Sequence, residues 1–144
     1  MLKNHKIKSC ARIIDANINR TKEGLRVCEE ITRFIFNSRK LTERLKETRH
    51  SIDPLAKRLA PLYTLIKERK SRQDIGKNIL ANEMRRGGFE DIFFANIQRV
   101  KESIRVLEEF SKLINKECAA GFKEIRYGVY EIEKQASKLM PSYK

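Results

Sequence analysis

A chain of 144 residues is long enough to bury a hydrophobic core, and we expect one domain spanning residues 1–144. No apolar run reaches the roughly 18 residues of a membrane-spanning helix, and no apolar signal core follows the basic N-terminus, so we expect a cytoplasmic protein with no membrane partner. The net charge of +13 suggests an anionic partner, although a solvated lysine-rich surface explains it equally well.

The spacing of the apolar residues predicts an all-α fold. They recur every three or four positions, and the chain has only three prolines and six glycines. A first helix is expected over residues 10–36, followed by a second for which Ser38 is a plausible N-cap. At Asp53-Pro54 this second helix either kinks or gives way to a new one, and Ala60-Pro61 interrupts it again.

The middle of the chain is the main candidate for a functional loop. Residues 54–88 connect the helical parts, the helical pattern weakens from residue 63, and the stretch K-E-R-K-S-R-Q-D-I-G-K-N at 67–78 is polar and basic. A short helix is possible near residues 78–86, and Gly87-Gly88 ends it. A third helix is expected over 89–115 and a fourth over 117–139.

One helical stretch occurs twice. Residues 16–34 return as residues 95–113 at an offset of 79, and 10 of these 19 positions are identical. We therefore divide the chain into repeat 1, about 11–53, and repeat 2, about 89–139, each an α-hairpin. Two such hairpins predict a four-helix bundle with an approximate internal two-fold axis.

The repeated polar residues lie on the apolar side of their helices. On a helical wheel Asn17 and Arg20 fall inside the apolar arc of the first helix, and Glu23 and Glu30 fall at its edge. The second copy has the equivalent set Asn96, Arg99, Glu102 and Glu109. A guanidinium on an apolar face is costly unless it is paired. We therefore expect Arg20 to pair with Glu23 or Glu109, and Arg99 with Glu102 or Glu30.

Two interpretations of this set remain open at the level of the sequence. Either it is a buried polar clamp that fixes how the hairpins pair, or it lines a cleft where arginines hold phosphate or carboxylate. Glu30 or Glu109 could hold Mg²⁺ with a substrate phosphate. The neighbouring Glu29 and Glu108 are expected to be solvated.

Other motifs add little. The loop segment D-I-G-K-N is no phosphate loop, because that motif needs glycine at Ser71 and serine or threonine at Asn78. Charge in the loop comes instead from Lys70, Arg72, Lys77, Arg85 and Arg86. The three cysteines form no C-x-x-C pair, which favours buried thiols over a disulfide framework or zinc site.

Several of these stretches together resemble a known family. R-I-I-D-A-N-I-N-R-T-K-E-G-L-R-V-C-E-E, L-K-E-T-R-H, R-Q-D-I-G-K, F-F-A-N-I-Q-R-V-K-E-S-I-R-V-L-E-E-F and F-K-E-I-R-Y are similar to the small helical domain found N-terminal to bacterial thiamine-phosphate synthases. The resemblance runs from about residue 11 to residue 139. No synthase barrel follows Lys144, so we expect a stand-alone protein or a separated domain.

The resemblance implies a thiamine-biosynthesis kinase that uses ATP and Mg²⁺ to convert hydroxymethylpyrimidine phosphate to its diphosphate. For such a reaction we expect that arginines clamp phosphate, asparagines orient it or the pyrimidine, glutamates hold the arginines or Mg²⁺, and loop residues close over the nucleotide. The expected catalytic residues are Arg20, Arg99, Glu23 and Glu102. The expected substrate-binding residues are Asn17, Asn96, Glu30, Glu109, Arg49, Arg126, Arg72, Asp74 and Lys77.

Three other functions compete with this one. The chain could be a non-catalytic helical partner module of thiamine-phosphate synthase, a nucleic-acid-binding protein, or a small mutase that uses buried arginines. The sequence has no recognition helix and little aromatic interleaving, which disfavours nucleic acid as a partner. A homo-oligomer is compatible with the sequence.

Overall fold

The computed structural model describes residues 2–78 and 81–140, and within these ranges it contains helices and loops but no strand. The predicted all-α class is therefore confirmed. The four long helices are α1 (Leu2–Phe34), α2 (Arg39–Leu59), α4 (Phe89–Ser111) and α5 (Lys116–Leu139). The shorter elements are the helix α3 (Leu62–Lys67) and two 3-10 turns, η1 (Ser71–Gln73) and η2 (Ala81–Met84).

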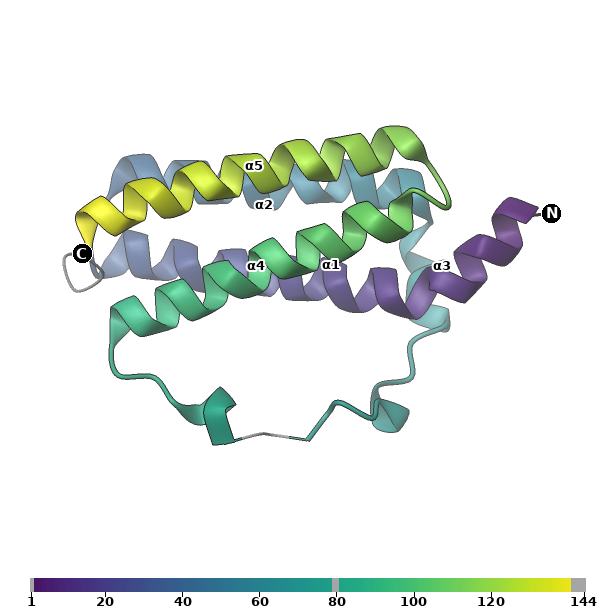
Figure 1. Ribbon diagram of the computed structural model, residues 1–144, viewed down its shortest axis with the longest axis horizontal. Helices are drawn as coiled ribbons and strands as arrows, with labels where there is room; N and C mark the ends of the chain where they lie inside the picture. The colour runs from purple at the N-terminus through teal and green to yellow at the C-terminus, as the bar shows by residue number, and fades with distance from the viewer. Residues whose placement is uncertain (1, 79–80, 141–144) are drawn as a thin grey trace.

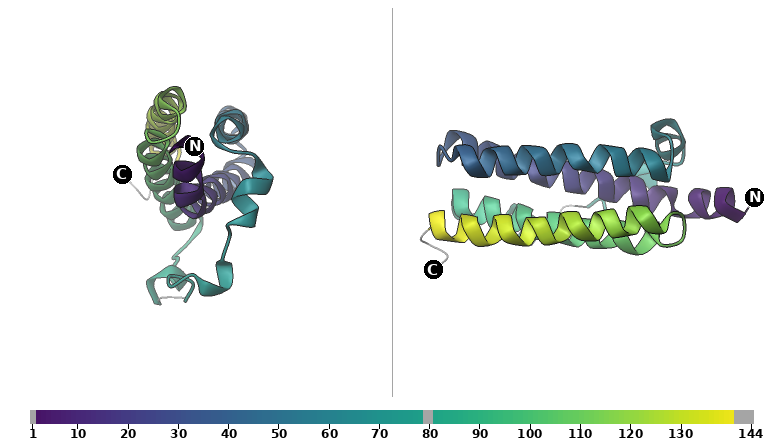
Figure 2. Two further views of the ribbon diagram at one scale, coloured as in Figure 1. Left: turned by 90° about the vertical axis from the view of Figure 1, so that its right-hand side faces the viewer. Right: turned by 90° about the horizontal axis from the view of Figure 1, so that it is seen from above.

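The four long helices form an antiparallel bundle, as the two predicted hairpins require. Helix α1 packs against α2 and α4, and α5 packs against α4 and α2, so the helices follow one another around the bundle as α1, α2, α5 and α4 (Figures 1 and 2). The first turns of α1 extend beyond the end of the bundle (Figure 1). The internal two-fold axis stays a prediction.

Local sequence signals explain most helix ends. Ser38 caps α2 as predicted, because its Oγ accepts a hydrogen bond from the Leu41 amide at 3.3 Å. Pro54 lies inside α2 and starts no new helix, whereas α2 ends before Ala60 and Pro61 is the N-cap of α3. Two predicted bounds are wrong. Helix α1 begins at Leu2 because nothing in residues 2–9 breaks a helix, and α4 ends at Ser111.

Asn115 explains the early end of α4. The predicted third helix included it, but its side chain caps the next helix by accepting a hydrogen bond from the Cys118 amide at 3.1 Å. An asparagine side chain that bonds to the backbone ahead of it favours a helix start over a helix interior.

The core lies between the four long helices, and α1 and α4 make a close contact at a glycine. Gly24 of α1 faces Val100 of α4, and next to this contact the hydroxyls of Thr21 and Ser103 lie 2.7 Å apart. The three cysteines are free and buried, as predicted. Burial raises the pKa of the Cys28 thiol well above its ordinary value, so this thiol stays protonated and unreactive.

Residues 68–88, which we call the connecting loop, run from the end of α3 to the start of α4. The loop arches beneath α1 and α4 along one side of the bundle (Figure 1). The short helix predicted near residues 78–86 corresponds to the 3-10 turn η2, and residues 79–80 of that prediction lie outside the described residues. The loop therefore faces the pair of helices that carry the repeated motif.

We predict that Gly24→Ala destabilises the protein. A Cβ at this position would lie 2.7 Å from Val100 Cγ2 and 3.2 Å from the backbone oxygen of Asn96. Overpacking costs about 1–3 kcal/mol, and the better helix propensity of alanine returns only about 1 kcal/mol. Chemical denaturation should show a lower free energy of unfolding.

Gly128→Ala is the matched control, because this helical glycine has nothing within 4 Å of an added Cβ. Its free energy of unfolding should rise by about 1 kcal/mol through helix propensity alone. Equal effects of the two substitutions would show that the α1–α4 contact is not tightly packed.

Candidate functional site

A groove lies between the bundle and the connecting loop. Its first part, the α4 cavity, has a volume of about 680 Å³ and is lined from α1, α4 and the loop. Its second part, the α3 cavity, has a volume of about 580 Å³ and reaches the residues that follow α3. The two cavities adjoin, because Asn17, Arg20 and Asp74 line both of them. Each is large enough for a small-molecule ligand.

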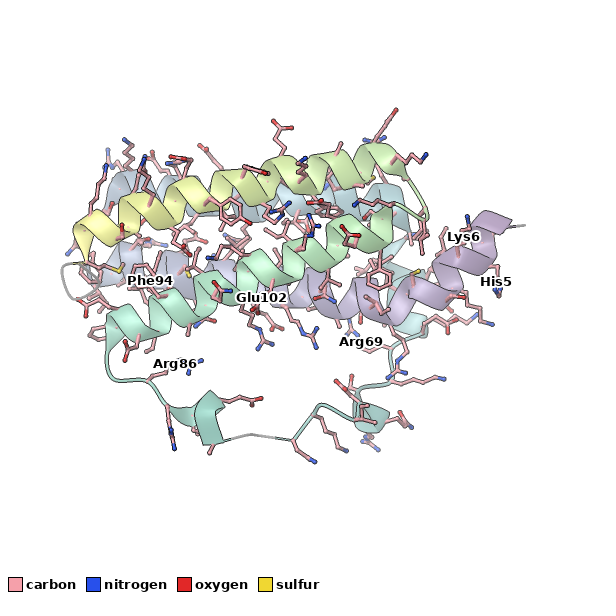
Figure 3. All side chains as sticks on the ribbon, viewed as in Figure 1. His5, Lys6, Arg69, Arg86, Phe94 and Glu102 are labelled. Atoms are coloured by element: carbon pink, nitrogen blue, oxygen red, sulfur yellow. The ribbon has the colours of Figure 1, made fainter. Side chains whose placement is uncertain are left out.

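The structure brings a large part of the predicted site together in the α4 cavity. These lining residues are Asn17, Arg20, Glu23, Asp74, Lys77, Arg99 and Glu102. Glu102 is labelled in Figure 3, near the middle of α4. The remaining predicted residues line neither cavity: Asn96, Glu30, Glu109, Arg49, Arg126 and Arg72. The repeated motif and the loop thus contribute to one groove.

Arg20 and Arg99 are not paired as predicted. Both are exposed, and among the described residues neither makes an ion pair, so the expected exchange of salt bridges between the copies is wrong. Arg20 Nη1 contacts Asn17 Oδ1 at 3.4 Å. The wheel placed these arginines within the apolar arc, but that part of the arc faces the groove. Their guanidinium groups therefore remain available to an anion.

The repeated asparagines make the same local bond but lie in different places. Asn17 Nδ2 donates to the Ile13 carbonyl, and Asn96 Nδ2 donates to the Ile92 carbonyl, both at 2.8 Å. Asn17 is buried and lines the groove, whereas the Asn96 backbone lies against Gly24 at the helix contact. Only one of the two asparagines is placed to meet a ligand in the groove.

Glu29 and Glu108 are buried, which corrects the expectation that they are solvated. Glu29 is 3% exposed and accepts from Arg49 Nε at 2.9 Å, while Arg26 lies nearby at 3.8 Å. On the helical wheel Glu29 falls at about 120° from Asn17, next to the apolar Ile18 and Leu25. This angle was a signal that sequence reasoning missed.

The second copy has the equivalent cluster. Glu108 is 4% exposed, binds Arg126 Nη2 at 2.9 Å and contacts Arg105 Nη1 at 3.0 Å. Arg126 also donates to the Tyr130 hydroxyl at 2.7 Å. Each hairpin is therefore held by a buried carboxylate and an arginine from its second helix. Arg49 and Arg126 have partners within the protein and serve the fold.

Asp15 anchors the connecting loop, and sequence reasoning missed it. This buried carboxylate receives two hydrogen bonds of 2.7 Å from the Arg69 guanidinium, at the point where the loop leaves α3 (Figure 3). Hydrogen bonding to Asp15 raises the pKa of Arg69. Asp15 is the only carboxylate in the first 22 residues, and this isolation was the available signal.

The loop has internal bonds that shape its part of the groove. Asp74 Oδ1 accepts a hydrogen bond from the Gly76 amide at 2.9 Å, and Lys77 Nζ donates to the Arg72 carbonyl at 2.8 Å. Glu83, which sequence analysis did not select, joins Asp74 and Lys77 in lining the α4 cavity. Arg72 itself is exposed and contributes its backbone oxygen rather than its charge.

The carboxylates of the α4 cavity can bind a magnesium ion only if a substrate phosphate supplies further ligands. Within the described residues no group of three or more His, Cys, Asp or Glu side chains could hold a metal ion. Mg²⁺ in phosphate-transfer sites, however, is commonly bound by one or two carboxylates together with substrate phosphates. The four carboxylates that line the α4 cavity are Glu23, Asp74, Glu83 and Glu102.

The two glutamates predicted as magnesium ligands have other partners. Glu30 lies 3.4 Å from Arg26 Nε. Glu109 lies 2.8 Å from Lys112 Nζ and 3.1 Å from Arg105 Nη2, and the hydrogen bond from Lys112 lowers the pKa of this carboxyl. These ion pairs lie outside the groove.

The fold and the groove define an all-α protein with a site between a helical bundle and one loop, lined by both arginine or lysine and carboxylate side chains. The chain belongs to the ThiD2 family, whose model matches residues 12–135. None of the described helices has both the length and the apolar character that crossing a membrane requires.

This chain is similar to one part of longer curated relatives. It is 39% identical over 128 residues to a thiamine-phosphate synthase of Rhodopirellula baltica, covering 88% of this chain and 34% of the relative. It is 40% identical over 126 residues to a thiamine-phosphate synthase of Synechocystis sp., covering 85% and 35%. The chain thus spans about a third of these relatives. No solved structure shows a significant match.

We predict that Glu108→Ala strongly destabilises the fold, whereas Glu109→Ala changes it little. The first substitution leaves the buried Arg126 without its carboxylate, at a cost of about 3 kcal/mol. The second removes an exposed carboxylate from the same helix. Denaturant midpoints measure the difference, and similar midpoints would contradict the clamp role of Glu108.

We also predict that Asp15→Asn loosens the connecting loop. The amide can no longer accept two charge-assisted hydrogen bonds from Arg69. Trypsin cleavage after Arg69, Lys70 and Arg72 should become several-fold faster. The control is Glu117→Gln, which breaks an exposed ion pair with Arg58 away from the loop. Unchanged cleavage in Asp15→Asn would show that the loop is held by other contacts.

Proposed function

We propose that the chain acts in thiamine biosynthesis as a kinase that converts hydroxymethylpyrimidine phosphate to its diphosphate with ATP. Family membership and the thiamine-phosphate synthase relatives support the pathway. The observation that carries the kinase proposal is the groove, where Arg20 and Arg99 of the repeated motif, which form no ion pair among the described residues, lie with Asp74 and Lys77 of the connecting loop.

The chemistry of the reaction suits such a groove. An oxygen of the acceptor phosphate attacks the γ-phosphorus of ATP, a new P–O bond forms, and the bond between the γ-phosphorus and the bridging oxygen breaks to release ADP. Because the acceptor oxygen is already anionic, the reaction needs no strong general base. What it needs is positioning and positive charge near the transferred group.

Residues from α1, α4 and the connecting loop supply this positive charge and hold the substrates in position. Arg20 on α1 and Arg99 on α4 supply charge-assisted donors to phosphate oxygens. Lys77 supplies a third cation from the loop. Mg²⁺ bound with the nucleotide would neutralise phosphate charge, and Glu23 or Glu102 are candidates to hold it. Asn17 orients the phosphate or the pyrimidine beside Arg20.

The loop gives the site a means of excluding water. It is fixed at one end by the ion pair of Asp15 with Arg69, its residues Asp74, Lys77 and Glu83 line the groove, and it joins α4 at Gly88. A bound triphosphate would lie between the loop and the bundle, in contact with both. Excluding water strengthens the arginine–phosphate interactions and disfavours hydrolysis of ATP.

The relatives also suggest a partner. Because about a third of each named synthase matches this chain, a non-catalytic helical module of thiamine-phosphate synthase is the competing function. A non-catalytic module would not need Arg20 and Arg99 to line a groove without an ion pair among the described residues. The groove therefore favours the kinase. Either function implies an association, direct or through a shared intermediate, with a thiamine-phosphate synthase.

We predict that purified protein with ATP, Mg²⁺ and hydroxymethylpyrimidine phosphate forms the diphosphate and ADP. Arg99→Ala should lower kcat by about 10²–10³, the loss expected when one donor to a developing charge is removed. Product formation can be followed by ³¹P NMR, which separates monophosphate from diphosphate.

The matched control is Arg39→Ala, an exposed arginine at the start of α2. It should keep the wild-type kcat. No turnover by folded wild-type protein would reject the kinase and leave the partner module. Equal losses in the two variants would instead point to a general effect of charge. Binding to DNA or RNA that weakens steeply with salt would support the nucleic-acid alternative.

A further inference from the structure

We propose that the two cavities of the groove take chemically different anions: the α3 cavity binds a phosphate monoester without metal, and the α4 cavity binds a polyphosphate only as its divalent-metal complex. This assignment deepens the proposed function and rests on it, because both ligands are substrates of that reaction.

The α3 cavity is basic. Its cations without an ion pair among the described residues are Arg12, Arg20 and Lys70. Arg69 also lines the cavity, but it neutralises Asp15 through two hydrogen bonds of 2.7 Å. A phosphate monoester carries nearly two negative charges at neutral pH, which suits this excess of positive charge without a metal.

The same cavity has an apolar wall. Ile13 and Ala16 of α1 and Val106 of α4 line it, and all three are partly exposed. Apolar side chains together with a few convergent polar groups are typical of a pocket for a small ring-bearing ligand. The α3 cavity can therefore hold a flat ring against this wall with its phosphate towards the arginines.

The α4 cavity has the opposite balance. Its carboxylates Glu23, Asp74, Glu83 and Glu102 outnumber its cations Arg20, Lys77 and Arg99. None of these carboxylates forms an ion pair among the described residues. A metal-free triphosphate would meet repulsion from all four, whereas a divalent cation chelated by the phosphates would be attracted to them.

Arg20 lies at the boundary. It and Asp74 are the charged residues common to the two cavities. A phosphoryl group passing from the polyphosphate to the monoester would cross this boundary, where the Arg20 guanidinium can contact oxygens of both ligands. Arg99, by contrast, lines only the α4 cavity, so it can contact only the polyphosphate.

The test measures binding by calorimetry, so it does not depend on turnover. Arg12→Ala and Lys70→Ala should each weaken hydroxymethylpyrimidine phosphate, titrated without metal, by about tenfold, as expected for one lost charge-assisted contact. The affinity for the Mg²⁺ complex of the β,γ-imido analogue of ATP should change less than twofold. Arg33→Ala, an exposed arginine farther along α1, is the control and should change neither.

Substitutions of the carboxylates in the α4 cavity should change the affinities for the Mg²⁺ complex and for the metal-free analogue in opposite directions. Glu83→Gln and Glu23→Gln should weaken the Mg²⁺ complex of the analogue several-fold and tighten the metal-free analogue, because the substitutions remove both the attraction and the repulsion. Glu131→Gln on the exposed face of α5 is the control. If these variants weaken the analogue equally with and without Mg²⁺, or if Arg12→Ala weakens both ligands equally, the assignment is overturned.

The outcomes also separate this assignment from the proposed function. The expected split in binding without any diphosphate formation would support the two ligand sites and reject the kinase. Turnover with no split would support the kinase and reject the assignment. Failure of wild-type protein to bind either ligand would reject both.

Discussion

A close contact between α1 and α4 determines where the residues that line the groove lie. Gly24 admits Val100 at this contact, and the hydroxyls of Thr21 and Ser103 meet beside it. A larger side chain at the glycine would separate the helices. Arg20 lies one turn before Gly24 on α1, and Arg99 directly precedes Val100 on α4. Both arginines therefore lie close to this contact and line the same groove, although 79 residues separate them in sequence.

The repeated motif divides its charged residues between two roles. Glu29 and Glu108 are buried and bind arginines from the second helix of their own hairpin, so they stabilise the scaffold. Arg20 and Arg99 make no ion pair among the described residues and face open volume. Burying a paired charge fixes geometry at little net gain in stability, and an unpaired exposed arginine leaves its donors for a ligand. Both roles constrain the same short motif.

Periodicity predicted the helices well, but it could not assign partners to the charges. The apolar spacing predicted the helices of the bundle, and Ser38 predicted the start of α2, because both signals are local in the sequence. The partner of Arg20 was predicted wrongly, since a wheel shows which side of a helix a residue occupies and not whether that side meets a core or a groove. The ion pair of Asp15 with Arg69 joins positions 54 residues apart, and no local signal identifies such a pair.

The asymmetry of the groove follows from parts that are not repeated. The position equivalent to Asp15 in the second copy is Phe94, so an equivalent carboxylate anchor for a second loop is lacking there. The chain also has a single connecting loop, which contributes Lys70 to one cavity and Glu83 to the other. Two copies of one motif alone would offer two similar charge environments. One anchored loop next to them makes the halves unequal, which is what the proposed reaction between two different phosphates would require.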